Sequence, residues 1–390
     1  MIQVRFIVPP SGPLLVSGAR VALANALFSG RHGGRMTVRI PGGDQRVTDD
    51  LRFLGVTWDA IAAPRDRAAA IETLKTRGRL YPCFESEVEL RAKQDRRLRR
   101  NQPSIYDRAM LKLTAEQRAA AEAGGKQPHW RFRLSDRTLS WRDMIGGWRE
   151  VKLPTVSDPV LIDAAGTVQP ALAAVLDDVA EGITHVIRAD EGAGNTGLYI
   201  DLLDALGRDP AEITFAHLPA AADAGRLAIR ALRQDGIEAE TIVAWLGGAG
   251  RFEPRNMAHA LDAAALPALN RSVLATRDFA AVRDRLPAGA GEAFWLAIRG
   301  HIDLLNEARY WWEVVSGTIF PQVPEDVPTT AAPPPEPWDR ETWPAWRAIL
   351  PPEAEPALRM RVTGEAQGPE LAALLPLIGR ARVMERLRGV

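Results

Sequence analysis

Four basic side chains in the first third of the sequence have the spacing of a phosphate-binding surface. Lys93, Arg96, Arg97 and Arg100 stand at i, i+3, i+4 and i+7, which places them on one face of a helix. Cations along such a face can neutralise the phosphates of a nucleic-acid backbone. The same spacing also occurs on helix faces that only contact water, and both interpretations stay open. No aromatic residues alternate with these cations, so stacking on bases is not indicated.

The other residues that carry chemistry form no catalytic motif. The sequence has no Gly-x-x-x-x-Gly-Lys-Ser/Thr phosphate loop, no Gly-x-Ser-x-Gly elbow and no histidine pair at the i, i+4 spacing of a zinc helix. Cys83 is expected to be a small buried apolar residue rather than a nucleophile. Asp177 and Asp178 are expected to point to opposite faces, one buried and one in water. We therefore predict no catalytic residue, no metal and no cofactor.

Length and composition indicate a soluble chain with more than one domain. The 390 residues predict two to three domains at about 150 residues each, and 46% apolar with 25% charged residues is ordinary for a core-forming protein. Lys+Arg and Asp+Glu are both 49, so no global field attracts nucleic acid. The sequence has no apolar run long enough to span a membrane, no signal-peptide pattern and a single cysteine. The cytoplasm is the expected location.

The order of secondary-structure patterns predicts an α/β domain. Residues 2–8 and 36–40 have strand patterns, and a helical pattern between them ends near Phe28. A second strand–helix–strand pattern begins at 184–188 and ends at 213–217. Strands that alternate with helices imply a parallel, doubly wound sheet, whose ligands bind beyond the carboxyl ends of the strands.

From about residue 226 the patterns become helical. Residues 294–316 are predicted to form one long amphipathic helix that carries Trp295, Trp311 and Trp312. The segment 321–337 holds seven prolines and is predicted to be an extended tether. The last fifty residues form a small apolar unit with a helical stretch over 369–387.

Several strings of residues resemble the glutamyl-tRNA synthetase family of class I aminoacyl-tRNA synthetases. These are VRFIVPPSGPLLVSGARVALANALFSG at the start, then LYPCFESEVELRAKQ, GITHVIRADEGAGNT and LAIRALRQDGIEAETIVAWLG, and finally FWLAIRGHIDLLNEARYWW, which is similar to α-proteobacterial members. The resemblance covers nearly the whole chain. It implies a Rossmann-type catalytic domain at 1–225 with a segment inserted at about 75–160. A helical domain similar to the family's stem-contact and anticodon-binding region follows at 226–320, and after the tether a C-terminal helical unit occupies 338–390.

The first ATP signature of the family is altered here. Members carry a loop of the type Pro-Ser/Thr-Gly-x-Leu-His-Val-Gly, and Ser11, Gly12 and Gly18 match it. The histidine is replaced by Leu15, which has no donor for phosphate charge, and a glycine is replaced by Ser17. Losing one preorganised donor of this kind typically costs ~10²–10³ in rate.

The second signature, Lys-x-Ser-Lys, is missing. It should follow the string FAHLP, but Pro219 leads into 220–226, which contains neither lysine nor serine, and the resemblance resumes at Leu227. A loop that clamps triphosphate in the transition state is therefore deleted.

The amino-acid pocket implied by the resemblance is partly retained. Arg5 and Arg188 match the family's arginines, while Pro41 replaces an acidic residue that contacts the substrate amine and Pro170 replaces a tyrosine. Two cations that can bind a small anion remain. The alternative is that both arginines form structural ion pairs.

These departures lead to a functional hypothesis with two alternatives. The leading hypothesis is a catalytically inactive synthetase-like protein that acts as a binding or scaffold component, with tRNA or a protein complex as partner and no membrane. In that case the Trp-rich segment at 295–312 is a candidate docking surface. The first alternative is an acyl transferase that uses charged tRNA or another activated donor and needs no ATP. The second alternative is a residual glutamate–tRNA ligase.

Overall fold

The computed structural model describes residues 1–9, 11–40, 45–248, 261–319, 332–351 and 353–388. The chain divides into two compact units, one made of 1–226 and 247–260 and the other of 227–246 and 261–390. Most of the predicted proline tether falls outside the described residues. Within those residues, no helix is both long and apolar enough to span a lipid bilayer.

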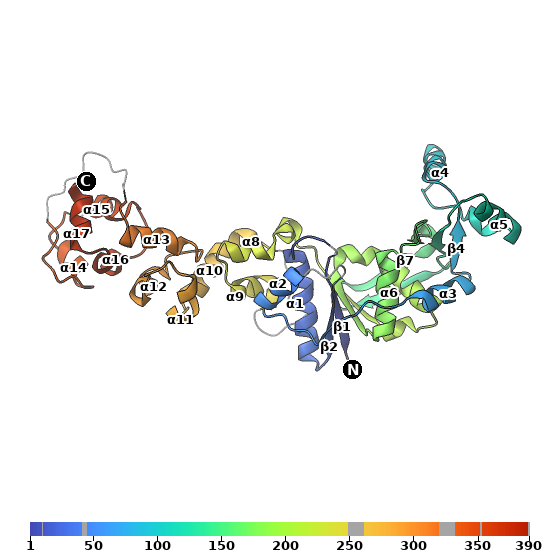
Figure 1. The fold of residues 1–390 in the computed structure, drawn as a ribbon, viewed down its shortest axis with the longest axis horizontal. Helices are drawn as coiled ribbons and strands as arrows, with labels where there is room; N and C mark the ends of the chain where they lie inside the picture. The colour runs from blue at the N-terminus through green and yellow to red at the C-terminus, as the bar shows by residue number, and fades with distance from the viewer. Residues whose placement is uncertain (10, 41–44, 249–260, 320–331, 352, 389–390) are drawn as a thin grey trace. The chain divides into compact units, whose positions relative to one another are not determined.

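The first unit opens with the predicted strand–helix–strand arrangement. Strands β1 (Gln3–Ile7) and β2 (Arg35–Arg39) pair in parallel, and α1 (Val16–Arg31) packs against both (Figure 1). Strand β3 (Ala60–Ile61) pairs with β2, and α2 (Gln45–Phe53) precedes it. The centres of β1 and β2 are buried, as expected for parallel strands covered by other elements.

A second strand–helix–strand set completes the α/β core. Its elements are α6 (Pro170–Glu181), β9 (His185–Ala189), α7 (Thr196–Ala205) and β10 (Thr214–Leu218). Strands β9 and β10 pair in parallel, which confirms the predicted α/β class. The antiparallel hairpin of β6 (Thr138–Asp143) and β7 (Gly147–Lys152) extends the sheet in the order β7-β6-β10-β9. Hydrogen bonds between Gln3 and Thr184 place β1 beside the start of β9.

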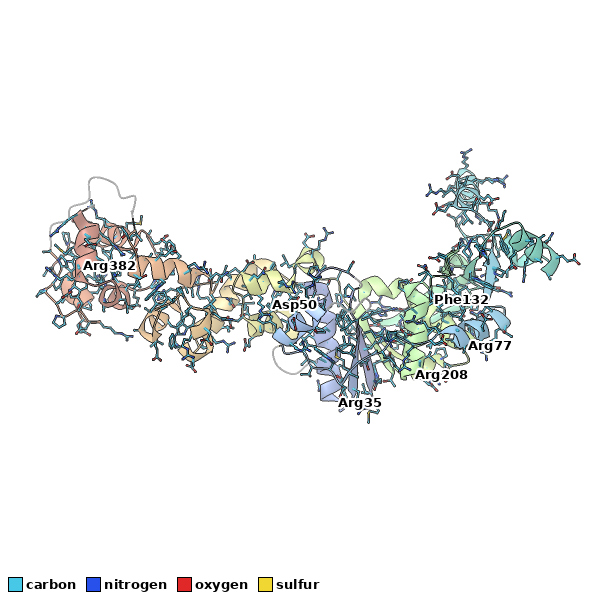
Figure 2. All side chains as sticks on the ribbon, viewed as in Figure 1. Arg35, Asp50, Arg77, Phe132, Arg208 and Arg382 are labelled. Carbon is cyan, nitrogen blue, oxygen red and sulfur yellow. The ribbon has the colours of Figure 1, made fainter. Side chains whose placement is uncertain are left out.

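The chain between β3 and α6 carries a third, antiparallel sheet. Its strands have the order β4-β5-β8, and its elements are α3 (Ala68–Thr76), β4 (Leu80–Cys83), α4 (Glu87–Arg99), α5 (Ala115–Ala123), β5 (His129–Phe132) and β8 (Val160–Ile162). The fully buried Phe132 joins this region to the apolar core of α6 and α7. Arg77 donates a 2.8 Å hydrogen bond to the carbonyl oxygen of Ala205, and both labelled side chains, Arg77 and Phe132, are shown in Figure 2.

The second unit is all-helical in the part that the structure describes. Its α-helices are α8 (Ile229–Gln234), α9 (Ala239–Val243), α10 (Leu266–Leu274), α11 (Phe279–Val282), α12 (Glu292–Ile298), α13 (Glu307–Ser316), α14 (Thr342–Arg347), α15 (Ala354–Thr363), α16 (Leu371–Ile378) and α17 (Arg380–Arg388). The helical stretch predicted at 369–387 is two helices, because Gly379 adopts a positive φ of 80° between them.

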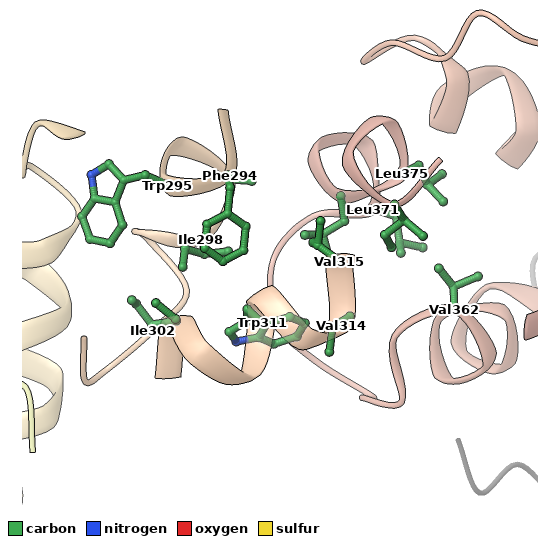
Figure 3. Packing of buried hydrophobic residues seen from close by; sticks show 14 of the residues in the cluster. Phe294, Trp295, Ile298, Ile302, Trp311, Val314, Val315, Val362, Leu371 and Leu375 are labelled. Carbon is green, nitrogen blue, oxygen red and sulfur yellow. The ribbon is translucent and has the colours of Figure 1, made fainter. Parts of the chain in front are cut away.

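The single long helix predicted at 294–316 is wrong. The chain bends between α12 and α13, where Ile302 and Leu305 are buried in the core. The Glu307 carboxylate accepts a 2.9 Å hydrogen bond from the backbone N–H of Leu304 and so stabilises the start of α13. Trp295 and Trp311 are buried in the same core (Figure 3), which removes these two side chains from the proposed docking surface.

Candidate active site

A cavity of about 440 Å³ lies where β1 and β9 end and α1 begins. This is the edge at which parallel α/β sheets bind ligands. The cavity is lined by Arg5, Phe6, Ile7, Pro9, Ser11, Pro13, Leu15, Ser17, Gly18, Val21, Ala174, Ile187, Arg188 and Ala189. The fold therefore brings together both predicted arginines and most of the altered signature loop.

Two predicted positions within the described residues do not line this cavity. Gly12 lies in the loop before α1 with a positive φ of 90°, a conformation that favours glycine. Pro170 is the first residue of α6 and is exposed, whereas Ala174, one turn later, reaches the cavity. Pro41 lies outside the described residues.

The positive charge of Arg5 is balanced inside the protein. Its Nε lies 3.1 Å from Asp178, a fully buried carboxylate that also pairs with Arg39 at 2.7 Å. The hydroxyl of Tyr199 donates a 2.7 Å hydrogen bond to the same carboxylate. Arg5 thus forms the structural ion pair that the sequence left as an alternative.

Within the described residues, the positive charge of Arg188 has no such partner. Its Nε donates to Nε2 of His217 at 3.1 Å and its Nη2 donates to Oγ1 of Thr196 at 2.7 Å, and both acceptors are uncharged. No carboxylate among the described residues forms an ion pair with it. Burial and the nearby charge of Arg5 lower the pKa of Arg188 to about 10, so the guanidinium is still protonated at neutral pH. The cavity wall therefore holds a cation that an anionic ligand can neutralise.

The altered signature positions have packing partners. Leu15 caps the N-terminus of α1 without a side-chain hydrogen bond and gives the cavity an apolar surface. The short 3₁₀ segment η5 (Ala222–Arg226) follows β10 and packs against α1. A Cβ atom added to Gly225 would lie 3.4 Å from the Cβ of Ser17. The η5 segment, which stands where the second signature is missing, thus lies against Ser17 of the altered first signature.

The basic residues predicted on one helix face do lie on α4. None of the thirteen residues of α4 is buried, and Arg100 caps its C-terminus. Lys93, Arg96 and Arg97 line a second cavity of about 220 Å³, but Arg100 does not.

Part of this basic charge is already paired. Lys93 forms ion pairs with Glu85 and, at 3.1 Å, with Asp107, whereas the side chain of Arg96 has no partner among the described residues. Sequence reasoning missed Arg131, which lines the same cavity and lies 4.1 Å from the ring of Tyr106. Only strand pairing of β4 with β5 brings Arg131 to this site.

Cys83 is buried, and burial raises the pKa of its thiol to about 11, so a nucleophilic thiolate is not available at neutral pH.

The prediction for the Asp177–Asp178 pair is wrong. Both residues lie in helix α6 rather than in an extended segment, and both are buried. Asp177 accepts two 2.8 Å hydrogen bonds from Arg67, and Asp178 binds Arg5.

Comparisons with known proteins extend over the whole chain. A family model described as "tRNA synthetases class I (E and Q), catalytic domain" matches residues 1–234. "Glutamate--tRNA ligase 2" of Gluconacetobacter diazotrophicus is 45% identical over 439 aligned positions and covers 99% of each chain, and the protein of the same name from Acidiphilium cryptum matches equally well. The structure resembles a solved glutamate-tRNA synthetase from Elizabethkingia anophelis with a TM-score of 0.80 over 99% of both chains. At 20% sequence identity that likeness supports the fold alone.

These relatives correct the hypothesis of a catalytically inactive scaffold. Full-length relatives at 45% identity are named glutamate–tRNA ligases, which favours the ligase alternative over an inactive protein. The alignment of 439 positions exceeds the 390 residues of this chain, so the relatives contain segments that it lacks. The hypothesis was based on the altered first signature, the missing second signature and the replaced pocket residues. It could not include the cavity, in which both arginines are in place.

Proposed function

Because this chain belongs to the glutamyl-tRNA synthetase family of class I aminoacyl-tRNA synthetases, we propose that it is a glutamate–tRNA ligase of residual activity. The observation that supports this most directly is the state of Arg188. Its guanidinium faces a cavity of about 440 Å³ at the carboxyl ends of the parallel strands and lacks a carboxylate partner among the described residues. One carboxylate of glutamate supplies that partner.

The proposed reaction has two steps. In the first, a carboxylate oxygen of glutamate attacks the α-phosphate of ATP and releases pyrophosphate. In the second, the terminal hydroxyl of tRNA attacks the activated carbonyl carbon and displaces AMP. Arg188 orients the amino acid for the first step. Leu15 provides no donor for the charge that develops on phosphate, so the first step is expected to be slower by ~10²–10³ than with a donor at this position.

The basic surface of α4 is the proposed contact for tRNA. Arg96 has no ion-pair partner in the part of the chain that the structure describes, and it lines the second cavity with Arg97 and Arg131. Arg131 adds a further cation to this cavity, although its Nη1 already donates a 2.6 Å hydrogen bond to the carbonyl oxygen of Asp158. Lys93 and Arg100 are secondary candidates, since Lys93 is paired and Arg100 lies beyond the cavity. Because tRNA is the proposed partner, we expect the protein in the cytoplasm.

The test uses two assays, pyrophosphate exchange and single-turnover aminoacylation with protein in excess of tRNA. Glutamate-dependent pyrophosphate exchange and formation of glutamyl-tRNA are measured for the wild type and for Arg188→Ala. The wild type is expected to show slow but glutamate-dependent rates in both assays, and the variant is expected to lose them. Wild-type rates equal to those of the variant would refute the proposal.

A further inference from the structure

A pair of fully buried side chains lies directly behind Arg188. Asp143 ends β6 and His217 lies in β10, and the parallel register that sets Phe215 opposite Asp143 brings the two together. Nδ1 of His217 lies 2.5 Å from Oδ2 of Asp143, and neither side chain is exposed to solvent. On its other edge, Nε2 of His217 contacts Arg188 and Thr196 at 3.1 Å each.

The partners of the imidazole define its protonation state. An arginine Nε can only donate, so Nε2 of His217 has to accept from Arg188 and carries no proton. The single proton of the neutral ring is therefore on Nδ1 and points at Asp143. Thr196 accepts from Arg188 through Oγ1, so its hydroxyl proton is free to donate to Nε2 as well.

The hydrogen bonds around Asp143 favour the ionised carboxylate that accepts from Nδ1 of His217. Its Oδ1 accepts backbone hydrogen bonds from Ile145 at 3.0 Å and Gly146 at 2.8 Å, which leaves Oδ2 for the histidine. Burial raises the pKa of Asp143, but the hydrogen bonds from His217 and from these backbone groups outweigh burial, and the pKa lies below its usual value.

We propose that His217 is a positioning residue for Arg188, and that Asp143 fixes the histidine tautomer that makes this possible. The inference rests on the proposed function, because it assigns the groups that aim Arg188 at the carboxylate of glutamate. Two neutral acceptors hold the guanidinium in place without cancelling its charge, whereas a carboxylate in their place would neutralise it.

Three substitutions separate positioning from simple packing. His217→Asn keeps a donor for Asp143 but loses the acceptor for Arg188, and His217→Gln keeps an acceptor near Nε2 but loses the donor to Asp143. Asp143→Asn keeps the oxygen that binds the backbone N–H groups. It then presents an amide donor to Nδ1, so the proton moves to Nε2, where it opposes a donor of Arg188.

We expect His217→Asn and Asp143→Asn to weaken glutamate binding by about tenfold to a hundredfold, measured by calorimetry. The affinity of His217→Gln is expected to stay closer to that of the wild type. The control is Asp163→Asn, because Asp163 follows β8, accepts a 2.8 Å hydrogen bond from the backbone N–H of Thr167 and does not line the cavity. Thermal unfolding is recorded for each variant. Losses of affinity that follow stability alone, with His217→Gln no better than His217→Asn, would overturn the positioning role.

Long-range ¹H–¹⁵N spectra of protein labelled in its imidazole rings test the tautomer without any ligand, and His217→Asn assigns the signal. The expected result is a neutral ring protonated on Nδ1 in the wild type and on Nε2 in Asp143→Asn. A wild-type ring protonated on Nε2, or on both nitrogens, contradicts the inference. If the wild type binds no glutamate, the proposed function fails, and the spectrum then decides the Asp143–His217 assignment by itself.

Discussion

Asp178→Asn is the substitution for which the structure predicts a large loss of stability. The carboxylate is fully buried and balances Arg5 at 3.1 Å and Arg39 at 2.7 Å. Asparagine has nearly the same shape, but it is neutral and replaces one acceptor oxygen with a donor. Breaking a buried ion pair by neutralising one partner costs about 3–5 kcal/mol. Because Arg39 keeps a second partner in Glu181 at 2.9 Å, we expect about 3 kcal/mol.

The neighbouring carboxylate provides a matched control. Asp177 lies in the same helix, and its one ion-pair partner among the described residues is Arg67, whose side chain is 31% exposed and can be solvated when the pair is lost. Because Arg67 is partly exposed, this pair is expected to contribute less than a fully buried one, about 1 kcal/mol. Asp177→Asn therefore makes the same chemical change one residue away at about a third of the cost.

Hydrogen exchange followed by mass spectrometry gives a local measurement, which a protein of two units requires. Since about 1.4 kcal/mol corresponds to a tenfold change, Asp178→Asn is expected to speed exchange of the most protected amides in β1 and α6 by roughly a hundredfold or more. Asp177→Asn is expected to change them less than about tenfold. Equal effects of the two variants would show that the buried charge network does not stabilise the sheet.

Three further predictions concern activity and reactivity. Leu15→His restores a donor beside the cavity and is expected to raise the rate of glutamate-dependent pyrophosphate exchange by at least about tenfold, without changing glutamate affinity; an unchanged rate would show that this position does not limit the reaction. Arg96→Glu combined with Arg97→Glu is expected to weaken tRNA binding and to reduce its salt dependence by about two phosphate contacts. The control is Arg91→Glu on the same helix, where the side chain is 77% exposed and paired with Glu87, and it is expected to have little effect. Equal losses of affinity would mean that the charge acts without a defined binding site. Cys83 is expected to resist thiol reagents at pH 8 in the folded protein and to react at once in denaturant, because burial raises its pKa to about 11; rapid labelling of the native protein would contradict its placement.

The sequence predicted those elements whose signals are local. The strands near residues 3–7 and 35–39 are short runs of residues that favour β-strands, and they end at prolines or glycines. The helix between them has its own apolar stripe. The bend between α12 and α13 had only one weak local signal, Gly300, which lies between the two helices. Ile298, Ile302 and Leu305 are all buried, and their spacing continues the helical period across the bend. The same apolar pattern therefore fits one straight helix or two helices that bury one core.

The two arginines of the cavity show why the site could be only partly predicted. Arg5 and Arg188 match the family equally well in sequence, yet the structure gives them different electrostatic states. Arg5 is neutralised by Asp178, which is 173 residues away along the chain, and Arg188 is held by His217, which is 29 residues away and uncharged. No local pattern distinguishes a carboxylate partner from an imidazole partner, because both depend on which elements pack behind the strand ends. Arg188 is the cation left without a counter-charge among the described residues, so it is the one that an anionic substrate can neutralise. It could be identified only from the fold, which places α6 behind β1 and β10 beside β9.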